Sequence, residues 1–434
     1  MGRIRGTIPA VPQSRRPGEI SHRARCGVVR QSRTKPAPLA SAAGRSGASM
    51  LERYERSGPP PREALMRLMT MRELLGITRI ADITGLDVLD IPVVQAVRPF
   101  SLLNSVSQGK GPTRTEAAVS AILEAAESYF AERLAHYDPI AASADSLNIP
   151  PERFEAHLQP GVDPGWRSRE IAWIHAENIL KGGLQDWVPF ELVHTAYVFP
   201  PRPHEEIFAS STSGLAASFE ETDSILHGIM ECIERDALTR AERIHGFFQR
   251  RRIDPRTIDD PTVASLLESL EAKGLLVGLW HAPSPLGLPV IWCHLMEDRP
   301  PETAILHHPA EGSAAGFDAA SAIVHAIYEA AQSRLTAISG ARDDLTRASY
   351  PKYPDWQKIA AHRRLLSDGP RDVHFHAIAG QNYTSAGNRM SALLAQIEGA
   401  GIDTVYMIQL DTRPLGDLSV VRIVIPALTP LLHG

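Results

Sequence analysis

Three long stretches with helical periodicity carry polar side chains at matched spacing. Residues three and four apart share one face of a helix, so each set forms a single stripe. In the second stretch the acids stand among apolar neighbours, which places them beside a buried face. The stripes are Ser120, Glu124 and Glu127; then Asp223, His227, Glu231 and Glu234, followed by Arg235; then His325, Glu329 and Gln332, with Arg334 nearby.

Such stripes suit a magnesium-bound polyphosphate. Mg²⁺ takes oxygen ligands in an octahedron, and carboxylates on facing helices supply them. Arginine and lysine then neutralise phosphate oxygens, arginine with a bidentate fork. The competing interpretation is a set of solvated helix faces with ordinary i, i+4 ion pairs. The apolar surroundings of Glu231 and Glu234 favour the edge of a cavity, where paired carboxylates need a cation. The pattern alone leaves both interpretations open.

A lysine precedes the first stripe. Lys110 stands between Gly109 and Gly111, which predicts a turn. The segment is not a P-loop, because no G-x-x-x-x-G-K-[ST] pattern is present. Lys110 is therefore either a plain turn lysine or a phosphate contact.

Composition limits the class of protein. The 434 residues carry a formal net charge of −5, which argues against a nucleic-acid partner. No apolar run approaches the ~20 residues that span a bilayer. Cys26, Cys232 and Cys293 show no metal or disulfide spacing, which fits a reducing cytoplasm. We expect a cytoplasmic protein without a membrane partner, in which Cys232 belongs to the core.

The first 49 residues differ from the rest. They are rich in Arg, Pro, Ser and Gly and hold a single acid, Glu19. This composition predicts a disordered basic extension over residues 1–49, followed by one domain over residues 50–434. Translation starting at Met50 is the favoured explanation. A targeting peptide comes second, and a nucleic-acid-binding arm third.

Hydrophobic periodicity from Met50 onward predicts an α+β fold without regular βαβ alternation. The expected helices cover residues 62–75, 113–133, 222–243, 262–273, 319–334 and 389–400. The expected strands cover residues 78–83, 91–98, 275–281, 289–296, 403–410 and 418–425, with further strands and a loop within 191–217.

Several blocks resemble the YcaO family in order along residues 60–428. The central block is Ser210–Ala217, with its Gly-Leu-Ala loop, leading into Glu231-Cys232-Ile233-Glu234-Arg235. The others are Gly76-Ile77-Thr78-Arg79, Thr84-Gly85-Leu86-Asp87, Ile91-Pro92-Val93-Val94, Val97-Arg98-Pro99, the first stripe, Glu329-Ala330-Ala331-Gln332-Ser333-Arg334, Asp411-Thr412-Arg413-Pro414 and Val421–Pro426.

The resemblance implies a fold around one ATP site with Mg²⁺. Members phosphorylate a backbone amide oxygen of a ribosomally made peptide, and a nucleophile then gives an azoline or a thioamide. It implies metal ligands at Glu124, Glu127, Asp223, Glu231 and Glu234. It implies nucleotide contacts at Lys110, Ser120, Ala216, Arg235, His325, Glu329, Gln332 and Arg334. No catalytic residue is assigned.

The opening strands resemble the branch that works with a TfuA-like partner, which is associated with thioamides. The chain ends at Gly434 without the proline-rich tail frequent in azoline-forming members. The resemblance also implies that a homodimer is common among members.

Departures cluster at the expected nucleotide site. Ser218-Phe219 stands where the family commonly has Gly-Asn, and His325 stands where it usually has Arg. Phe219 offers no side-chain hydrogen bond, and His325 lacks the guanidinium fork. The alternative function is therefore a catalytically degenerate scaffold that binds a peptide or a partner protein.

Overall fold

The computed structural model describes residues 58–133, 137–197, 206–299, 303–343, 354–378, 385–410 and 418–430, with single positions at 350, 380, 412 and 416. The described residues all belong to the larger of two units, residues 48–434. The predictions for residues 1–49, for a start at Met50 and for Asp411, Arg413 and Pro414 lie outside the described residues.

A three-stranded antiparallel sheet and a helix open the larger unit. The strands β1 (Arg79–Asp82), β2 (Val93–Val97) and β3 (Val106–Lys110) lie side by side in chain order. The chain then enters α2 (Arg114–Ala131), whose N-cap Thr113 accepts a hydrogen bond from the main-chain N–H of Glu116. The helix α1 (Pro61–Met71) packs on α2.

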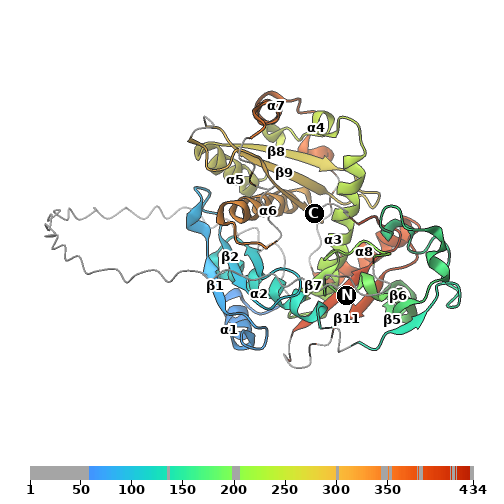
Figure 1. Ribbon diagram of the computed structural model, residues 1–434. Coiled ribbons are helices and arrows are strands. Elements are labelled where there is room, and N and C mark those ends of the chain that lie inside the picture. The colour runs from blue at the N-terminus through green and yellow to red at the C-terminus, as the bar shows by residue number, and fades with distance from the viewer. Residues whose placement is uncertain are drawn as a thin grey trace, which may run out of the picture. The chain divides into compact units, whose positions relative to one another are not determined.

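A second sheet repeats this plan later in the chain. The strands β8 (Leu275–Ala282), β9 (Val290–Glu297) and β10 (Ala310–Ala315) form an antiparallel sheet. The helix α6 (Ala319–Ser339) follows, with Asp318 as its N-cap. Helices α5 (Pro261–Ala272) and α7 (Trp356–Asp368) pack against β8. In Figure 1, α6 runs beneath β8 and β9.

The third sheet has six strands from distant parts of the chain. Its order is β4 (Ile140–Ala142), β5 (Ile171–Asn178), β11 (Tyr406–Gln409), β12 (Ser419–Val424) and β7 (Leu215–Ser218), and β6 (Leu184–Pro189) pairs with β5. The long helix α3 (Glu221–Glu242) follows β7 and packs on β12. The helix α8 (Ala386–Gly399) packs on α3. The short helix α4 (Phe247–Arg250) follows α3 in the chain.

Two glycines let a strand approach its helix closely. A Cβ added at Gly109 of β3 would lie 2.0 Å from the main-chain nitrogen of Ala121 in α2. A Cβ added at Gly312 of β10 would lie 2.1 Å from the main-chain nitrogen of Ala330 in α6. Real Cβ atoms do not come that close to a backbone, so these strands rest directly on the helix main chain. The same contact therefore sets the position of the helix in the β3–α2 pair and in the β10–α6 pair.

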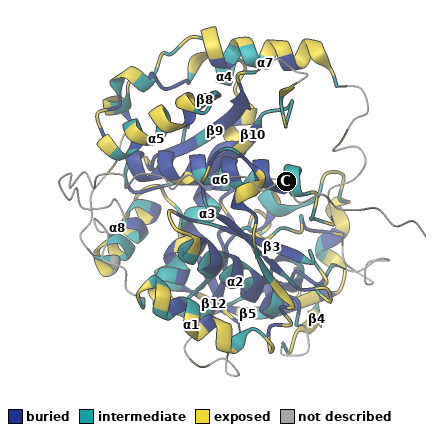
Figure 2. Ribbon diagram, turned by 90° about the vertical axis from the view of Figure 1, so that its left-hand side faces the viewer, coloured by how far each residue is buried: buried dark blue, intermediate teal, exposed yellow. Residues whose placement is uncertain are grey.

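Burial follows the expected amphipathic pattern. The core around α2 includes Phe154, Trp173 and Tyr406, and a second core lies between α3 and β12. A third core buries Ile323 and Ile327 of α6 against β9. Figure 2 shows α6 mostly in dark blue, whereas α5 and α8 carry exposed yellow faces. None of the helices in the described part of the chain is both long and apolar enough to cross a membrane.

The α+β prediction is confirmed, and the six expected helices all exist with shifted ends. The predicted turn at residues 109–111 is wrong, because Gly109 and Lys110 close strand β3. Within 191–217, the described residues form a strand only at β7. The sequence pattern predicts no strand at β5, although its first four residues are apolar, at β6, where Gln185 and Asp186 interrupt the apolar residues, or at β10, which consists mainly of small residues. It predicts no helix at α7.

Candidate functional site

Each of the first three acids is held by a main-chain N–H from a strand or from the loop that leads into one. Glu124 and Glu127 project from α2, where Glu124 accepts from Gln108 of β3. Glu127 reaches the next sheet and accepts from the N–H of Ala217 in β7 at 2.8 Å. On α3, Glu231 accepts from the N–H of Gly214 at 3.1 Å. These bonds fix the carboxylates before any ligand arrives.

Glu234 is held from the sheet of β8, β9 and β10. The hydroxyl of Ser313 donates to its Oε1 at 2.6 Å, and the N–H of Ala315 donates to its Oε2 at 3.3 Å. Both donors lie in β10. The guanidinium of Arg235 lies 3.5 Å from Glu231 and 3.5 Å from Glu234, so this cation stands between the two acids of α3.

The stripe on α6 returns to the first sheet. Lys110, at the end of β3, forms an ion pair of 2.8 Å with Glu329. The amide of Gln332 donates to the main-chain oxygen of Gln108 at 3.2 Å. Each of the helices α2, α3 and α6 follows a strand, which gives three strand–helix units: β3–α2, β7–α3 and β10–α6. The helix α2 contacts β7, α3 contacts β10 and α6 contacts β3, so the three units form a closed ring around the acids.

The acids crowd one another. Burial raises the pKa of Glu124 to about 7 despite the nearby Lys110. Burial, together with the charges of Glu124 and Glu231, raises the pKa of Glu127 well above its ordinary value. Burial also raises the pKa of Glu234, against the lowering effect of Arg235. For Glu329 burial opposes ionisation, but Lys110 and Arg235 outweigh it and lower its pKa. Buried carboxylates with so little positive charge beside them would be stabilised in their ionised form by a bound cation.

The geometry also limits how a cation is held. Among the described residues, no three His, Cys, Asp or Glu side chains stand close enough to enclose one metal ion. Mg²⁺ is usually bound by one or two protein carboxylates, with waters and substrate phosphates completing its shell. The acids of α2 and α3 therefore fit Mg²⁺ that arrives with a phosphate ligand. They would hold the ion, while Lys110 and Arg235 would face the phosphates.

Two histidines take part in this group, and one was not assigned from the sequence. His227 of α3 acts electrostatically on both His325 and Glu329. His325 is accessible to water, yet enough protein surrounds it that burial, reinforced by Lys110 and His227, lowers its pKa to about 4. It is neutral at pH 7 and cannot replace an arginine as a fixed charge. His227 lies four residues before Glu231, as His325 lies four residues before Glu329, and this shared spacing could have indicated a role for His227 from the sequence.

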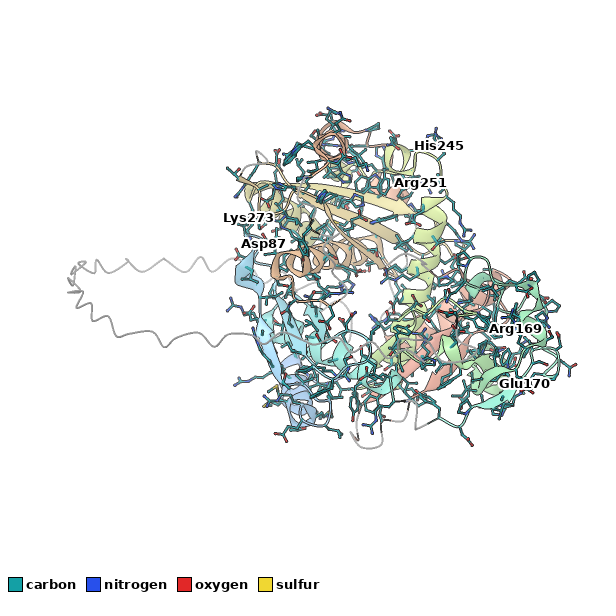
Figure 3. The ribbon with its side chains drawn as sticks, in the orientation of Figure 1. Asp87, Arg169, Glu170, His245, Arg251 and Lys273 are labelled. Atoms are coloured by element: carbon teal, nitrogen blue, oxygen red, sulfur yellow. The ribbon has the colours of Figure 1, made fainter. Side chains whose placement is uncertain are left out.

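Arg334 lies apart from these groups. Its side chain is 0% exposed and binds Asp87 at 2.6 Å and Glu297 at 2.5 Å. Asp87, labelled in Figure 3, lies beside α6. A guanidinium with no exposed surface that is paired with two carboxylates cannot also reach a nucleotide, so the expected direct contact is replaced by a structural role that anchors α6 to β9.

Three other predicted residues occupy separate positions. Asp223 lies in the first turn of α3, eight residues or about 12 Å of helix rise before Glu231. Ser120 is half-buried one turn before Glu124. Ala216 is fully buried in β7, and its neighbour Ala217 makes the contact to Glu127.

Phe219, which replaces a polar residue of the YcaO pattern, has a place in the packing. Its ring is partly buried against the first core, and the guanidinium carbon of Arg67 in α1 lies 5.9 Å from the ring centre. The substitution therefore exchanges a hydrogen-bonding group for a contact with α1.

A family model described as YcaO cyclodehydratase, ATP- and Mg²⁺-binding, matches residues 108–429. This range contains all three helices of the ring. The chain belongs to the YcaO family. The predicted family and its cofactors, ATP and Mg²⁺, are thereby confirmed.

Two relatives align with most of this YcaO chain. An uncharacterized protein of Methanothermobacter thermautotrophicus is 32% identical over 85% of this chain and 94% of its own length. A protein described as lying in the tfuA 3′ region of Rhizobium leguminosarum bv. trifolii is 29% identical over 90% of this chain and 92% of its own.

Solved structures share the fold. YcaO from Methanopyrus kandleri, bound with AMPPCP and Mg²⁺, has a TM-score of 0.65 at 21% identity over 86% of this chain and 93% of that one. A heterocyclase in complex with substrate and cofactor has a TM-score of 0.68 at 20% identity over 87% of this chain. This chain spans about half, 53%, of that heterocyclase. At these identities the likeness confirms the α+β YcaO fold.

Proposed function

We propose that this protein uses ATP and Mg²⁺ to phosphorylate a backbone amide oxygen of a ribosomally made peptide. Family membership supports ATP-dependent modification of a peptide in general. The observation that carries the proposal is the ring itself. Four carboxylates on α2 and α3 are held by main-chain or hydroxyl donors and face Lys110 and Arg235.

The chemistry is a leaving-group problem. Bound ATP supplies the phosphoryl group that turns a poorly leaving amide oxygen into a phosphate, and ADP is released. A nucleophile then adds at the amide carbon, and inorganic phosphate leaves with the former amide oxygen. The protein's part is to hold the phosphates in line and to neutralise their charge, which is the main source of catalysis in phosphoryl transfer. We assign that task to Lys110 and Arg235, the cations beside Glu329 and Glu231.

Thioamide formation with a TfuA-like partner is the finer proposal. It is supported by the relative in the tfuA 3′ region, which aligns with 90% of this chain. An external sulfur nucleophile would replace oxygen at the amide carbon. An azoline would instead form from a neighbouring Cys, Ser or Thr side chain, with net loss of one water. Mass spectrometry of a peptide treated with ATP, Mg²⁺, sulfide and a TfuA-like protein separates the two outcomes, because their mass changes have opposite signs.

A scaffold without catalysis is the second candidate. His325, neutral at pH 7, stands in place of a fixed cation, and Phe219 packs toward α1 instead of offering a hydrogen bond. Both changes weaken contacts to a nucleotide. In that case the protein would bind a peptide or partner protein without turning over ATP.

Calorimetric titration of ATP with Mg²⁺ into the full chain decides between them. We expect binding that is lost in Glu231→Gln, because an amide cannot replace a carboxylate beside Mg²⁺. Glu177→Gln, at an exposed position of β5, is the matched control and should bind as the wild type does. No binding by the wild-type protein at high ATP would refute the catalytic proposal.

A further inference from the structure

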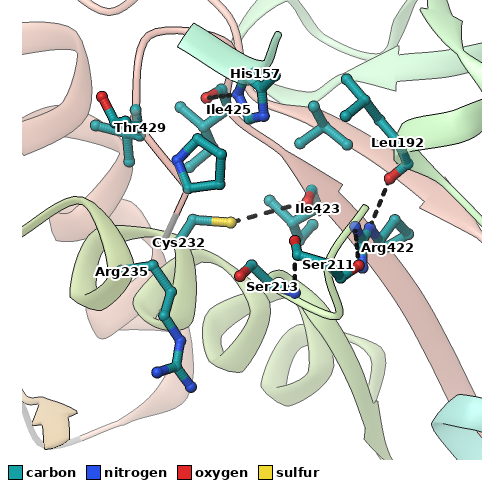
Figure 4. A pocket seen from close by; sticks show the side chains of 13 residues that line it. His157, Leu192, Ser211, Ser213, Cys232, Arg235, Arg422, Ile423, Ile425 and Thr429 are labelled. Carbon is teal, nitrogen blue, oxygen red and sulfur yellow. Dashed lines mark hydrogen bonds between the residues drawn. The ribbon is translucent and has the colours of Figure 1, made fainter. Parts of the chain in front are cut away.

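A pocket lies behind the acids of α3. It is lined by α3, by the loop before β7, by β12 and by the segment that follows it, and its accessible volume is about 30 Å³. Figure 4 shows Cys232 and Arg235 on the helix side, Ser211 and Ser213 on the loop, and Arg422 and His157 around the remaining wall. This space has room for one small polar group and not for a whole ligand.

Arg422 is the unusual member of this wall. It is 3% exposed, and its Nε and Nη2 donate to the main-chain oxygens of Leu192 and Ser211 at 2.9 and 2.8 Å. Its Nη1 has no hydrogen-bond partner among the described residues, and none of their carboxylates is within ion-pairing distance. A buried guanidinium held only by carbonyl groups is short of negative charge.

Burial lowers the pKa of Arg422 and outweighs Glu231, which attracts the charge of Arg422 from beyond ion-pairing distance. The Nε2 atom of His157 lies within hydrogen-bond distance of the main-chain oxygen of Ile425, at 3.3 Å. The thiol of Cys232 faces the main-chain oxygen of Ile423 at 3.8 Å, and burial raises its pKa to about 12, so it stays a neutral thiol. The hydroxyls of Ser211 and Ser213 are neutral donors. The wall thus offers Arg422, which lacks a carboxylate partner, Arg235, which is shared with Glu231 and Glu234, and hydroxyl donors within a largely apolar lining.

The pocket adjoins the expected reaction centre through shared residues. Arg235 lines the pocket and also lies beside Glu231 and Glu234. Gly214, next to the lining residue Ser213, donates to Glu231. A peptide bound with one group in this pocket would therefore place its neighbouring amides close to the acids.

We propose that this pocket binds a carboxylate of the peptide substrate, with Arg422 as its specificity-determining residue. The carboxylate belongs either to an acidic side chain or to the C-terminus of the peptide. This inference rests on the proposed function, since it names a feature of the substrate of the same site. A carboxylate supplies the charge that Arg422 lacks and accepts from the two serine hydroxyls.

Selection from a displayed library of random heptapeptides tests the proposal. The full chain is immobilised in the presence of Mg²⁺ and AMPPCP. The library is used in two formats, one with a free C-terminus and one with both ends blocked. We expect the wild-type protein to enrich Asp or Glu at one position, or free C-termini, by about tenfold, as for one charge-assisted contact. Blocked peptides that retain the acidic preference assign a side-chain carboxylate; enrichment confined to free C-termini assigns the terminal one.

Two variants address the pocket in different ways. Arg422→Met removes the cation, and Ser213→Leu fills the pocket while leaving Arg422 unchanged, which keeps the test valid if the first variant fails to fold. Thr212→Leu, at an exposed neighbouring position outside the lining, is the control. We expect Ser213→Leu to lose the preference and Thr212→Leu to keep it.

A wild-type pool without acidic or C-terminal preference overturns the proposal, as does a preference that survives Ser213→Leu. Titration of ATP with Mg²⁺ into the same preparations separates this failure from failure of the proposed function. Retained ATP binding without a carboxylate preference rejects the pocket assignment alone. Absent ATP binding in the wild-type protein rejects the amide-activating function.

Discussion

Gln332 of α6 donates a hydrogen bond of 3.2 Å to the main-chain oxygen of Gln108 in β3, 224 residues earlier. The side chain of Gln108 in turn accepts from the hydroxyl of Thr336, one turn further along α6. The equivalent position on α2 is Glu127, bound to β7, and on α3 it is Glu234, bound to β10. The same position on each helix therefore contacts the strand of the next strand–helix unit. That position is glutamine on α6 and glutamate on α2 and α3.

The close contacts of Gly109 and Gly312 should make both positions intolerant of any side chain. Gly109→Ala and Gly312→Ala each force a strand away from the helix backbone, which we expect to lower the free energy of unfolding by about 3 kcal/mol or more and to weaken ATP binding. Urea unfolding and calorimetry measure the two effects. Gly85→Ala, where an added Cβ meets nothing within 4 Å, should be almost neutral. Equal stability of all three variants would contradict the close-packing argument.

Ser313→Ala should reduce affinity for Mg²⁺ with ATP by about tenfold. The hydroxyl holds Glu234 at 2.6 Å, and hydrogen bonds to charged groups contribute about 1.5–3 kcal/mol. Calorimetric titration measures the change. Ser224→Ala is the matched control, since its buried hydroxyl donates to the main-chain oxygens of Glu220 and Ser419. A loss of affinity of the same size in both variants would point to a general structural effect.

The buried triad of Arg334, Asp87 and Glu297 should contribute strongly to the stability of the packing between α6 and β9. Glu297→Gln leaves Arg334 with one carboxylate and is expected to lower the free energy of unfolding by about 3–5 kcal/mol. Glu63→Gln, in an ion pair with Arg67 on the surface of α1, should change it by less than about 0.5 kcal/mol. Denaturant unfolding compares them, and similar small losses would show that the triad is weakly coupled to the fold.

His294 should make the protein less stable in mild acid. It is buried against His362 at 3.1 Å, and burial, assisted by that neighbour, lowers its pKa from 6.5 to about 3. The unfolded chain therefore takes up a proton that the folded chain refuses, and stability falls as the pH drops below about 6.5 toward 3.

Replacing His294 by Phe should remove part of this dependence. Urea midpoints measured from pH 7.5 to 5 are expected to fall less steeply in His294→Phe than in the wild type. His376, whose side chain is 68% exposed, serves as the control, and His376→Phe should keep the wild-type slope. Parallel curves for all three proteins would rule out His294 as a source of acid sensitivity.

The stripes of Glu124 and Glu127, of Glu231 and Glu234, and of Glu329 and Gln332 could be predicted from the sequence, because helix periodicity is a local property. The α+β class followed from the same local patterns, and the resemblance to the YcaO family followed from motif order. The strand β10 was not predicted because its small residues give a weak apolar signal. The apolar run that opens β5 is only four residues long, and so short a run does not distinguish a strand from a helix.

Only the tertiary structure decided how these residues meet. In the folded chain Lys110 forms an ion pair with Glu329, and His227 lies near enough to act on the charge of Glu329. Arg334 is buried in an ion triad with Asp87 and Glu297. These partners lie up to 247 residues apart, and their meeting depends on how three sheets and their helices pack. Helix periodicity fixes which face a residue occupies, whereas close packing between distant units fixes what that face touches.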